Sequence, residues 1–232
     1  MTMVPTDRRS DRVLFVALWL VLLSYALLFA PPPPADLFGQ LRDLALARVP
    51  SVDPIAIAVF NLLGVLPVAF LAILLFDTGR PNPWPFALGS FVLGGFVLLP
   101  YLAIRDTRAP LQTAPCAFVR AVGSRITGAI LLLAALGLMG FAVLAGDMNA
   151  FAAQLQDSAF IAVMSVDLLV LTTALHRCAV IDRQRCGLRL SGWSSPAVHL
   201  PLLGPLLYLA LRKREERDGL RMKPRDATGS AR

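Results

Sequence analysis

The sequence predicts an all-α protein, a polytopic bundle of about six hydrophobic transmembrane helices with one interfacial amphipathic helix. Apolar residues make up 56% of the chain and charged residues only 16%, whereas an ordinary soluble domain carries roughly 45–50% and about 25%. The apolar residues also form long uninterrupted blocks, and about 20 such residues cross a ~30 Å hydrocarbon core as a helix. Together, composition and block length favour a membrane protein.

The apolar blocks set the expected helices and divide the chain into three parts. A polar N-terminal tail covers residues 1–12, a single transmembrane domain covers 13–211, and a basic tail covers 212–232. The first block is longer than the usual 7–15 residue core of a signal peptide, so we expect a retained helix. The expected helices lie at about 13–30, 54–76, 84–104, 127–146, 158–176 and 193–211.

A short charged segment separates the first two blocks. Asp36 can cap its start, and Leu37, Leu41 and Leu44 share one face. Its charges and its length argue against a span and favour a helix that lies at the membrane surface. The turn at 77–83 is also short, so the helices at 54–76 and 84–104 should form an antiparallel hairpin that crosses twice.

The last block is the least regular, because Pro201, Gly204 and Pro205 interrupt it. Six spans would divide Lys and Arg almost evenly between the two sides of the membrane. The charges would then give no basis for orienting the chain in the membrane. If the last block is re-entrant instead, most basic residues share one side. The positive-inside rule would then make that side cytoplasmic and place the N-terminus outside. We favour six spans and keep the re-entrant arrangement as the alternative.

The net charge of +7 does not indicate a nucleic-acid partner. The Lys and Arg residues lie in short connections and in the C-terminal tail, as membrane topology requires. The expected partners are the lipid bilayer, anionic lipid headgroups that contact the basic loops and tail, and a membrane-protein partner or a second copy of the chain.

Asp167 is the one acidic residue near the middle of an expected span. A carboxylate there costs about 2.5–3.5 kcal/mol on insertion scales, so a compensating interaction is required. The functional interpretation is a proton or cation site. The alternative, which we favour, is a packing group that bonds Asn61, Ser90 or a backbone carbonyl.

Several small residues and prolines are interpreted as helix-packing positions. Asn61 can bond across helices, and Ser90 and Gly94 have the spacing that lets helices approach closely. Pro67 removes an intrahelical hydrogen bond, so we expect a kink there. The full set of packing positions is Gly64, Pro67, Gly89, Gly94, Gly95 and Pro100.

No pattern in the sequence predicts a catalytic residue, a cofactor site or a metal site. The spacing of His176, Cys178, Cys186 and His199 matches no established zinc pattern. Hydrolase motifs are also lacking, so we do not expect an enzyme.

Several residues between 60 and 101 resemble the sequence pattern of a known family. The matching residues are Phe60-Asn61, Gly64, Pro67, Pro83-Trp84-Pro85-Phe86, Gly89-Ser90-Phe91, Gly94, Phe96 and Leu98-Leu99-Pro100-Tyr101. They resemble a family of uncharacterised polytopic membrane proteins of cyanobacteria and plastids. The resemblance implies a multi-pass protein of a bacterial inner membrane or a thylakoid-type membrane, but no activity.

The sequence therefore predicts an accessory or structural membrane component that acts through helix or lipid contacts. The alternative function is a small transporter or channel that uses Asp167.

Overall fold

The computed structural model of the chain describes residues 8–32, 36–49, 52–107, 109–112, 115–186, 200 and 202–212. In this part the secondary structure is helical apart from an isolated β-bridge between Asp77 and Leu111, so the predicted all-α class is confirmed. The helices are α1 (Arg8–Ser24), continued by the π-helix η1 (Tyr25–Phe29), α2 (Leu37–Ala45), α3 (Pro54–Leu74), α4 (Pro83–Leu93), α5 (Gly95–Ile104), α6 (Ala117–Val122), α7 (Arg125–Ala145), α8 (Met148–Asp157), α9 (Ala159–Arg185) and α11 (Leu203–Leu211).

Many of these helices start where a side chain can satisfy the first free backbone N–H groups. Asp36 accepts a hydrogen bond from Gly39 N at 2.8 Å and starts α2, as predicted. Asp53 and Asn82 do the same for α3 and α4, and in both helices a proline holds the first position. Ser124, Asp147 and Ser158 start α7, α8 and α9.

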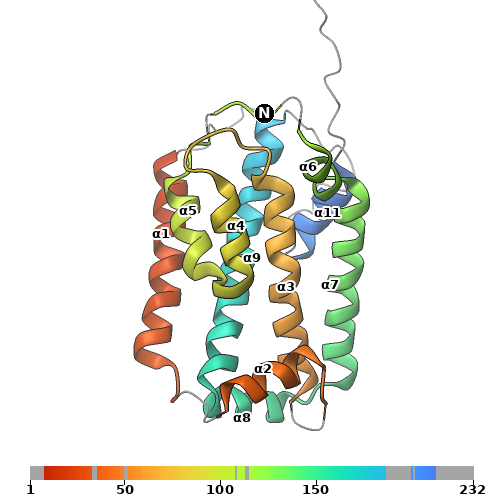
Figure 1. The fold of residues 1–232 in the computed structure, drawn as a ribbon. Coiled ribbons are helices and arrows are strands. Elements are labelled where there is room, and N and C mark those ends of the chain that lie inside the picture. Colours follow the sequence, from red (N-terminus) through yellow and green to blue (C-terminus); the bar gives the residue numbers. More distant parts are fainter. Residues whose placement is uncertain are drawn as a thin grey trace, which may run out of the picture.

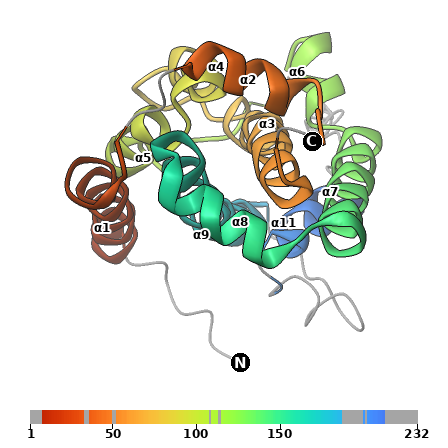
Figure 2. The ribbon, with the colours of Figure 1, turned by 90° about the horizontal axis from the view of Figure 1, so that it is seen from below.

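Four helices of the described chain are long and apolar enough to cross a membrane, namely α1 with η1, α3, α7 and α9. They run side by side, with α3 and α9 in the middle and α1 and α7 on opposite flanks (Figures 1 and 2). Most of α3 is buried, whereas most of α1 and α7 is exposed. The main core lies around α3 and includes Leu66, Phe70, Leu99, Leu175 and Leu206.

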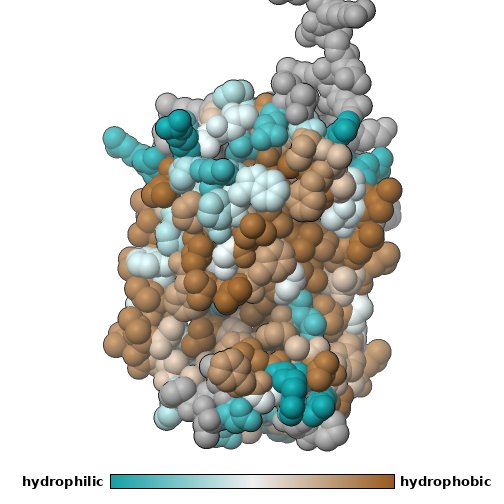
Figure 3. Space-filling view, viewed as in Figure 1, coloured by the Kyte–Doolittle hydropathy of each residue, from teal (hydrophilic) through white to brown (hydrophobic). Residues whose placement is uncertain are grey.

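The molecule has two polar ends with an apolar belt between them (Figure 3). At one end α2 and α8 lie across the bundle (Figure 1), where Ser158 Oγ donates to Gln40; we call this the α2–α8 end. The opposite end is called the arginine-rich end, because it holds ten of the arginines whose side chains the structure describes: Arg9, Arg12, Arg80, Arg105, Arg120, Arg125, Arg177, Arg183, Arg185 and Arg212.

The segment expected to cross the bundle at 84–104 does not do so. It forms two short helices, α4 and α5, which run antiparallel in the half of the bundle near the arginine-rich end (Figure 1). A Cβ atom added at Gly89 of α4 would lie 3.3 Å from Val97 Cγ1 of α5. The chain on either side of this hairpin also meets, since Gln112 N donates to Phe76 O at 2.8 Å and Thr78 Oγ1 to Pro110 O at 2.6 Å.

Gly94 is the physical reason for the reversal. Its φ of +52° and ψ of −132° belong to a region that residues with a side chain rarely adopt, so the helix ends there and a new one starts at Gly95. The expectation of a crossing helix at 84–104 is therefore corrected: hydropathy measures only the length of an apolar block, and the block divides at a glycine.

The described part of the last apolar block, α11, ends at the arginine-rich end. Residues 193–199 and 201 lie outside the described residues, but the end of α9 and the end of α11 are both at the arginine-rich end. Tyr208 Oη and Arg212 Nη1 each donate to Asp182 Oδ2 at 2.8 Å. The described residues hold four candidate spans, so the expectation of six is not confirmed.

Candidate functional site

Asp167 lies inside α9 and points at the reversal of the α4–α5 hairpin. Its side chain is buried, with 6% of the residue exposed. Both carboxylate oxygens accept the N–H of Gly95, at 2.9 Å for Oδ1 and 3.2 Å for Oδ2. Gly95 is the first residue of α5, whose N–H would otherwise have no helical acceptor. Asp167 thus caps α5 from a neighbouring helix.

The contact leaves no space for a side chain on either glycine. A Cβ at Gly94 would lie 1.8 Å from Asp167 Oδ2, and a Cβ at Gly95 would lie 2.5 Å from Oδ1. The first helix holds the same reversal in place, because Trp19 Nε1 donates to Phe96 O at 3.2 Å. We call Gly94, Gly95 and Asp167 the hairpin junction.

This geometry offsets part of the electrostatic cost of burying the Asp167 carboxylate. Its partner carries the partial positive charge of a helix N-terminus, which favours an anion. The sequence analysis named Asn61, Ser90 or a backbone carbonyl as partners of Asp167. The observed partner is a backbone N–H group, so the carboxylate acts as a hydrogen-bond acceptor.

Asn61 and Ser90 use carbonyl groups of their own helices. Asn61 Nδ2 donates to Ile57 O at 2.8 Å, and Ser90 Oγ donates to Ala87 O at 2.7 Å. These bonds do not link helices.

The predicted packing positions differ in their surroundings. A Cβ at Gly64 would meet nothing within 4 Å, whereas Gly89, Gly94 and Gly95 are closely approached. Pro67 is buried inside α3, and Pro100 is half-buried inside α5. Among these predicted positions, close approach is thus seen at the glycines of the α4–α5 hairpin and not at Gly64.

A buried ion-pair cluster lies at the arginine-rich end, and the sequence analysis did not predict it. Asp77 follows the end of α3 and pairs with Arg105, at 3.3 Å from Nη1 to Oδ2, and with Arg185. Arg185 Nη2 also donates to Ala109 O at 2.6 Å. Burial favours the neutral form of Arg105, but the neighbouring Cys178 and Asp77 raise the pKa of Arg105 above its usual value, so this side chain stays charged.

A second buried pair joins α9 to the residue after α11. The side chains of Asp182 and Arg212 are each 1% exposed, and Arg212 Nη2 donates to Ala72 O at 2.6 Å and to Gly123 O at 3.2 Å. The sequence analysis placed Arg212 at the start of the basic tail, and in the structure Arg212 joins three separate parts of the bundle. In the sequence, nothing distinguishes Arg212 from the basic residues that follow it. Residues 213–232 lie outside the described residues.

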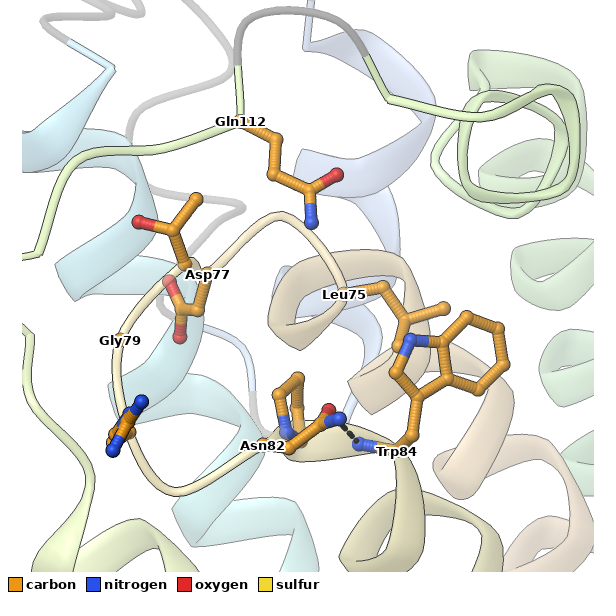
Figure 4. A pocket seen from close by; sticks show the side chains of 9 residues that line it. Leu75, Asp77, Gly79, Asn82, Trp84 and Gln112 are labelled. Atoms are coloured by element: carbon orange, nitrogen blue, oxygen red, sulfur yellow. Dashed lines mark hydrogen bonds between the residues drawn. The ribbon is translucent and has the colours of Figure 1, made fainter.

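A pocket opens beside this cluster. Its volume is about 390 Å³, and it is lined by Leu75, Asp77, Thr78, Gly79, Arg80, Asn82, Pro83, Trp84 and Gln112. Figure 4 shows Gln112 and Trp84 on one side of the pocket and Asp77 and Gly79 on the other, with Asn82 bonded to the backbone at the start of α4. All of these residues belong to the arginine-rich end.

The Cys and His residues weighed for a metal site do not gather in the described chain. Cys178 is buried and accepts a hydrogen bond from Arg105 Nη2 at 3.5 Å, while Cys186 Sγ lies 3.9 Å from Asp182 Oδ1. His199 lies outside the described residues. Among the described residues, no group of three or more His, Cys, Asp or Glu could hold a metal ion.

Comparisons with known protein families, with curated proteins and with solved structures found no match for this chain.

Proposed function

We propose that the chain is a multi-pass membrane protein that acts as an accessory or structural component, through contacts with other helices and with lipid. The hairpin junction is the observation that carries this proposal. The Asp167 carboxylate, within the apolar belt, is buried, and both of its oxygens are directed at a backbone N–H of the same chain. Such a group stabilises the bundle, because it joins α9 to the start of α5.

The membrane setting rests on the four long apolar helices and on the apolar belt of Figure 3. Large apolar side chains face outward along the flanking helices, including Val13, Leu20, Ile130, Leu133 and Val143. Exposure of this kind favours lipid contact over water. The resemblance to multi-pass proteins of cyanobacteria and plastids points the same way, and a bacterial inner membrane or a thylakoid-type membrane is the proposed location.

The arginines suggest an orientation. Among the arginines with described side chains, Arg42 and Arg48 lie at the α2–α8 end and the rest at the arginine-rich end. By the positive-inside rule the arginine-rich end faces the cytoplasm, and the N-terminal end of α1 lies there too. Four crossing helices, with the α4–α5 hairpin and α11 returning to the cytoplasmic side, account for this asymmetry. The sequence-based alternative placed the N-terminus outside because it counted 84–104 as a span.

Cysteine labelling in intact cells or vesicles tests this topology. In a background without Cys116, Cys178 and Cys186, single cysteines replace the exposed residues Thr78, Gln112 and Asn149. We expect a membrane-impermeant reagent to label positions 78 and 112 from the same side, and position 149 from the other. Labelling of 78 and 112 from opposite sides would restore a crossing helix at 84–104.

A small transporter or channel is the second candidate, and one observation favours it. The break at Gly94 places the start of α5 within the apolar belt, and such broken helices recur at the substrate sites of transporters. In this chain the helix end already faces an internal carboxylate.

Replacing Asp167 with Asn separates the two candidates. Asn retains an acceptor oxygen for Gly95 N but has no proton to exchange. A structural component should stay folded and retain any co-purifying protein, and proton flux in reconstituted vesicles should match that of the wild-type chain. Asp157→Asn, at an exposed acid of α8, is the matched control. Proton flux that disappears only in Asp167→Asn would establish the carrier and overturn the proposal.

A further inference from the structure

The pocket at the arginine-rich end has unused hydrogen-bond donors. Three side chains that line it carry N–H groups without an acceptor among the described residues, namely Arg80, Trp84 and Gln112. Arg80 and Gln112 are exposed, and the Trp84 indole lies across the pocket from Asp77 in Figure 4. Donors from three positions thus surround one space of about 390 Å³.

The charge of this pocket is positive in spite of Asp77. Arg105 and Arg185 both pair with the Asp77 carboxylate, so two cations offset one anion. Arg80 adds a third positive charge and Asp106, which lies beside Gly79, a second negative one, so three cations face two anions. Free N–H donors together with net positive charge suit the oxygens of a phosphate group.

An exposed apolar stripe leads away from the pocket along α4. Trp84, Leu88 and Phe91 are four and three residues apart, so they share one face of the helix. Leu88 and Phe91 are 55% and 48% exposed. Phe118 of α6 widens the stripe next to the pocket, because its ring centroid lies 5.6 Å from that of Trp84 and the residue is 53% exposed.

A polar pocket that opens onto an apolar stripe matches a molecule with a phosphate at one end and hydrocarbon at the other. We propose that this pocket binds the phosphate of a glycerophospholipid headgroup, with an acyl chain along Leu88 and Phe91. The positive charge favours an anionic lipid such as phosphatidylglycerol, and a tryptophan at the start of α4 fits the depth of the membrane interface. This inference rests on the proposed membrane setting and gives it a defined lipid site.

Lipid titration of the purified full-length protein tests the site. The protein in neutral detergent is mixed with phosphatidylglycerol or phosphatidylcholine, and native mass spectrometry measures the lipid retained. We expect Arg80→Gln to weaken phosphatidylglycerol binding about tenfold, since a hydrogen bond to a charged group contributes roughly 1.5–3 kcal/mol. Trp84→Phe keeps an aromatic ring beside Phe118 but removes the N–H, and it should weaken binding by a smaller factor.

Arg12→Gln is the matched control, because it removes the same charge from the same end of the molecule at an exposed position outside the pocket. Equal binding by the Arg80 and Arg12 variants would overturn the site. Glycerol 3-phosphate and inorganic phosphate, which lack acyl chains, should not compete at concentrations where the lipid saturates. If they bind as well as the lipid, the site takes a soluble phosphate and the lipid assignment is wrong.

The two proposals fail in different ways. If the labelling pattern at 78, 112 and 149 is as expected but Arg80→Gln leaves binding unchanged, only the lipid site is rejected. If the wild-type chain does not insert or labels with a different pattern, the proposed membrane function is rejected, whatever the lipid titration shows.

Discussion

Asp167 and Asp182 lie on the same helix, α9, and are both buried, yet they are stabilised in different ways. Asp167 accepts the backbone N–H of Gly95. Asp182, four turns further along, accepts from the guanidinium of Arg212 and the hydroxyl of Tyr208. The first contact joins α9 to a helix end within the apolar belt, and the second joins it to a cation at the polar end of the bundle.

The difference shows that the partner of a buried carboxylate depends on whether it lies within the apolar belt or near a polar end of the bundle. Burying an ion pair requires the desolvation of two charges, and other polar groups must satisfy the remaining donors. Near the arginine-rich end the carbonyls of Ala72 and Gly123 accept from Arg212 Nη2, whereas the buried Nε of Arg212 has no partner among the described residues. Within the apolar belt a backbone N–H supplies a partial positive charge without a second ion, so a helix break serves in place of an arginine.

The largest expected effect comes from breaking the Asp182–Arg212 pair. Arg212→Met leaves Asp182 without its cation, and removing one member of a buried pair costs roughly 3–5 kcal/mol. Thermal unfolding in detergent measures the loss. Arg183→Gln, at the next position of α9, should have little effect. The double variant Asp182→Leu with Arg212→Met should recover most of the stability, and a double variant no better than Arg212→Met would mean that the pair is not the cause.

Gly94→Ala should have the next largest effect. A side chain at a positive φ costs about 1–3 kcal/mol, and the new Cβ would also displace Asp167 Oδ2, which lies 1.8 Å from its position. Gly64→Ala is the control, because a Cβ there meets nothing within 4 Å and alanine favours a helix by up to ~1 kcal/mol. The same unfolding assay checks both. Equal stability of the two variants would contradict the stabilising role of the hairpin junction.

Ser90→Ala should have the smallest effect. The hydroxyl group donates to Ala87 O in its own helix, and such a bond contributes about 1 kcal/mol or less. Unfolding of Ser90→Ala beside Gly94→Ala, four residues away, therefore compares a local hydrogen bond with the junction. A loss as large as that of Gly94→Ala would show that Ser90 connects helices.

The sequence was sufficient to predict the helical class and the presence of long apolar helices, because lipid contact requires long apolar blocks. It was not sufficient to count the crossings. A 21-residue apolar block has the same hydropathy whether it crosses once or divides at Gly94. Asp167 was identifiable as the exceptional acid of the apolar blocks, but its partner Gly95 is 72 residues away in the chain, and no local pattern connects the two.

The buried cluster was missed for a related reason. Arg105, Arg185 and Arg212 follow apolar blocks, as membrane-flanking arginines generally do. The sequence analysis assigned such arginines to loops and a tail that contact lipid headgroups. Pairing with Asp77 and Asp182 depends on which helix ends meet in space, and only the structure supplies that.

The position of Arg212 also affects the order in which the protein can mature during synthesis. The guanidinium binds Ala72 O, Gly123 O and Asp182, which emerge from the ribosome well before it. Until Arg212 is made, these three acceptors lack this donor, and the helices that carry them are not yet held together by it. Completion of this contact thus requires translation through residue 212, so a nascent chain that stalls earlier has Asp182 without its cation.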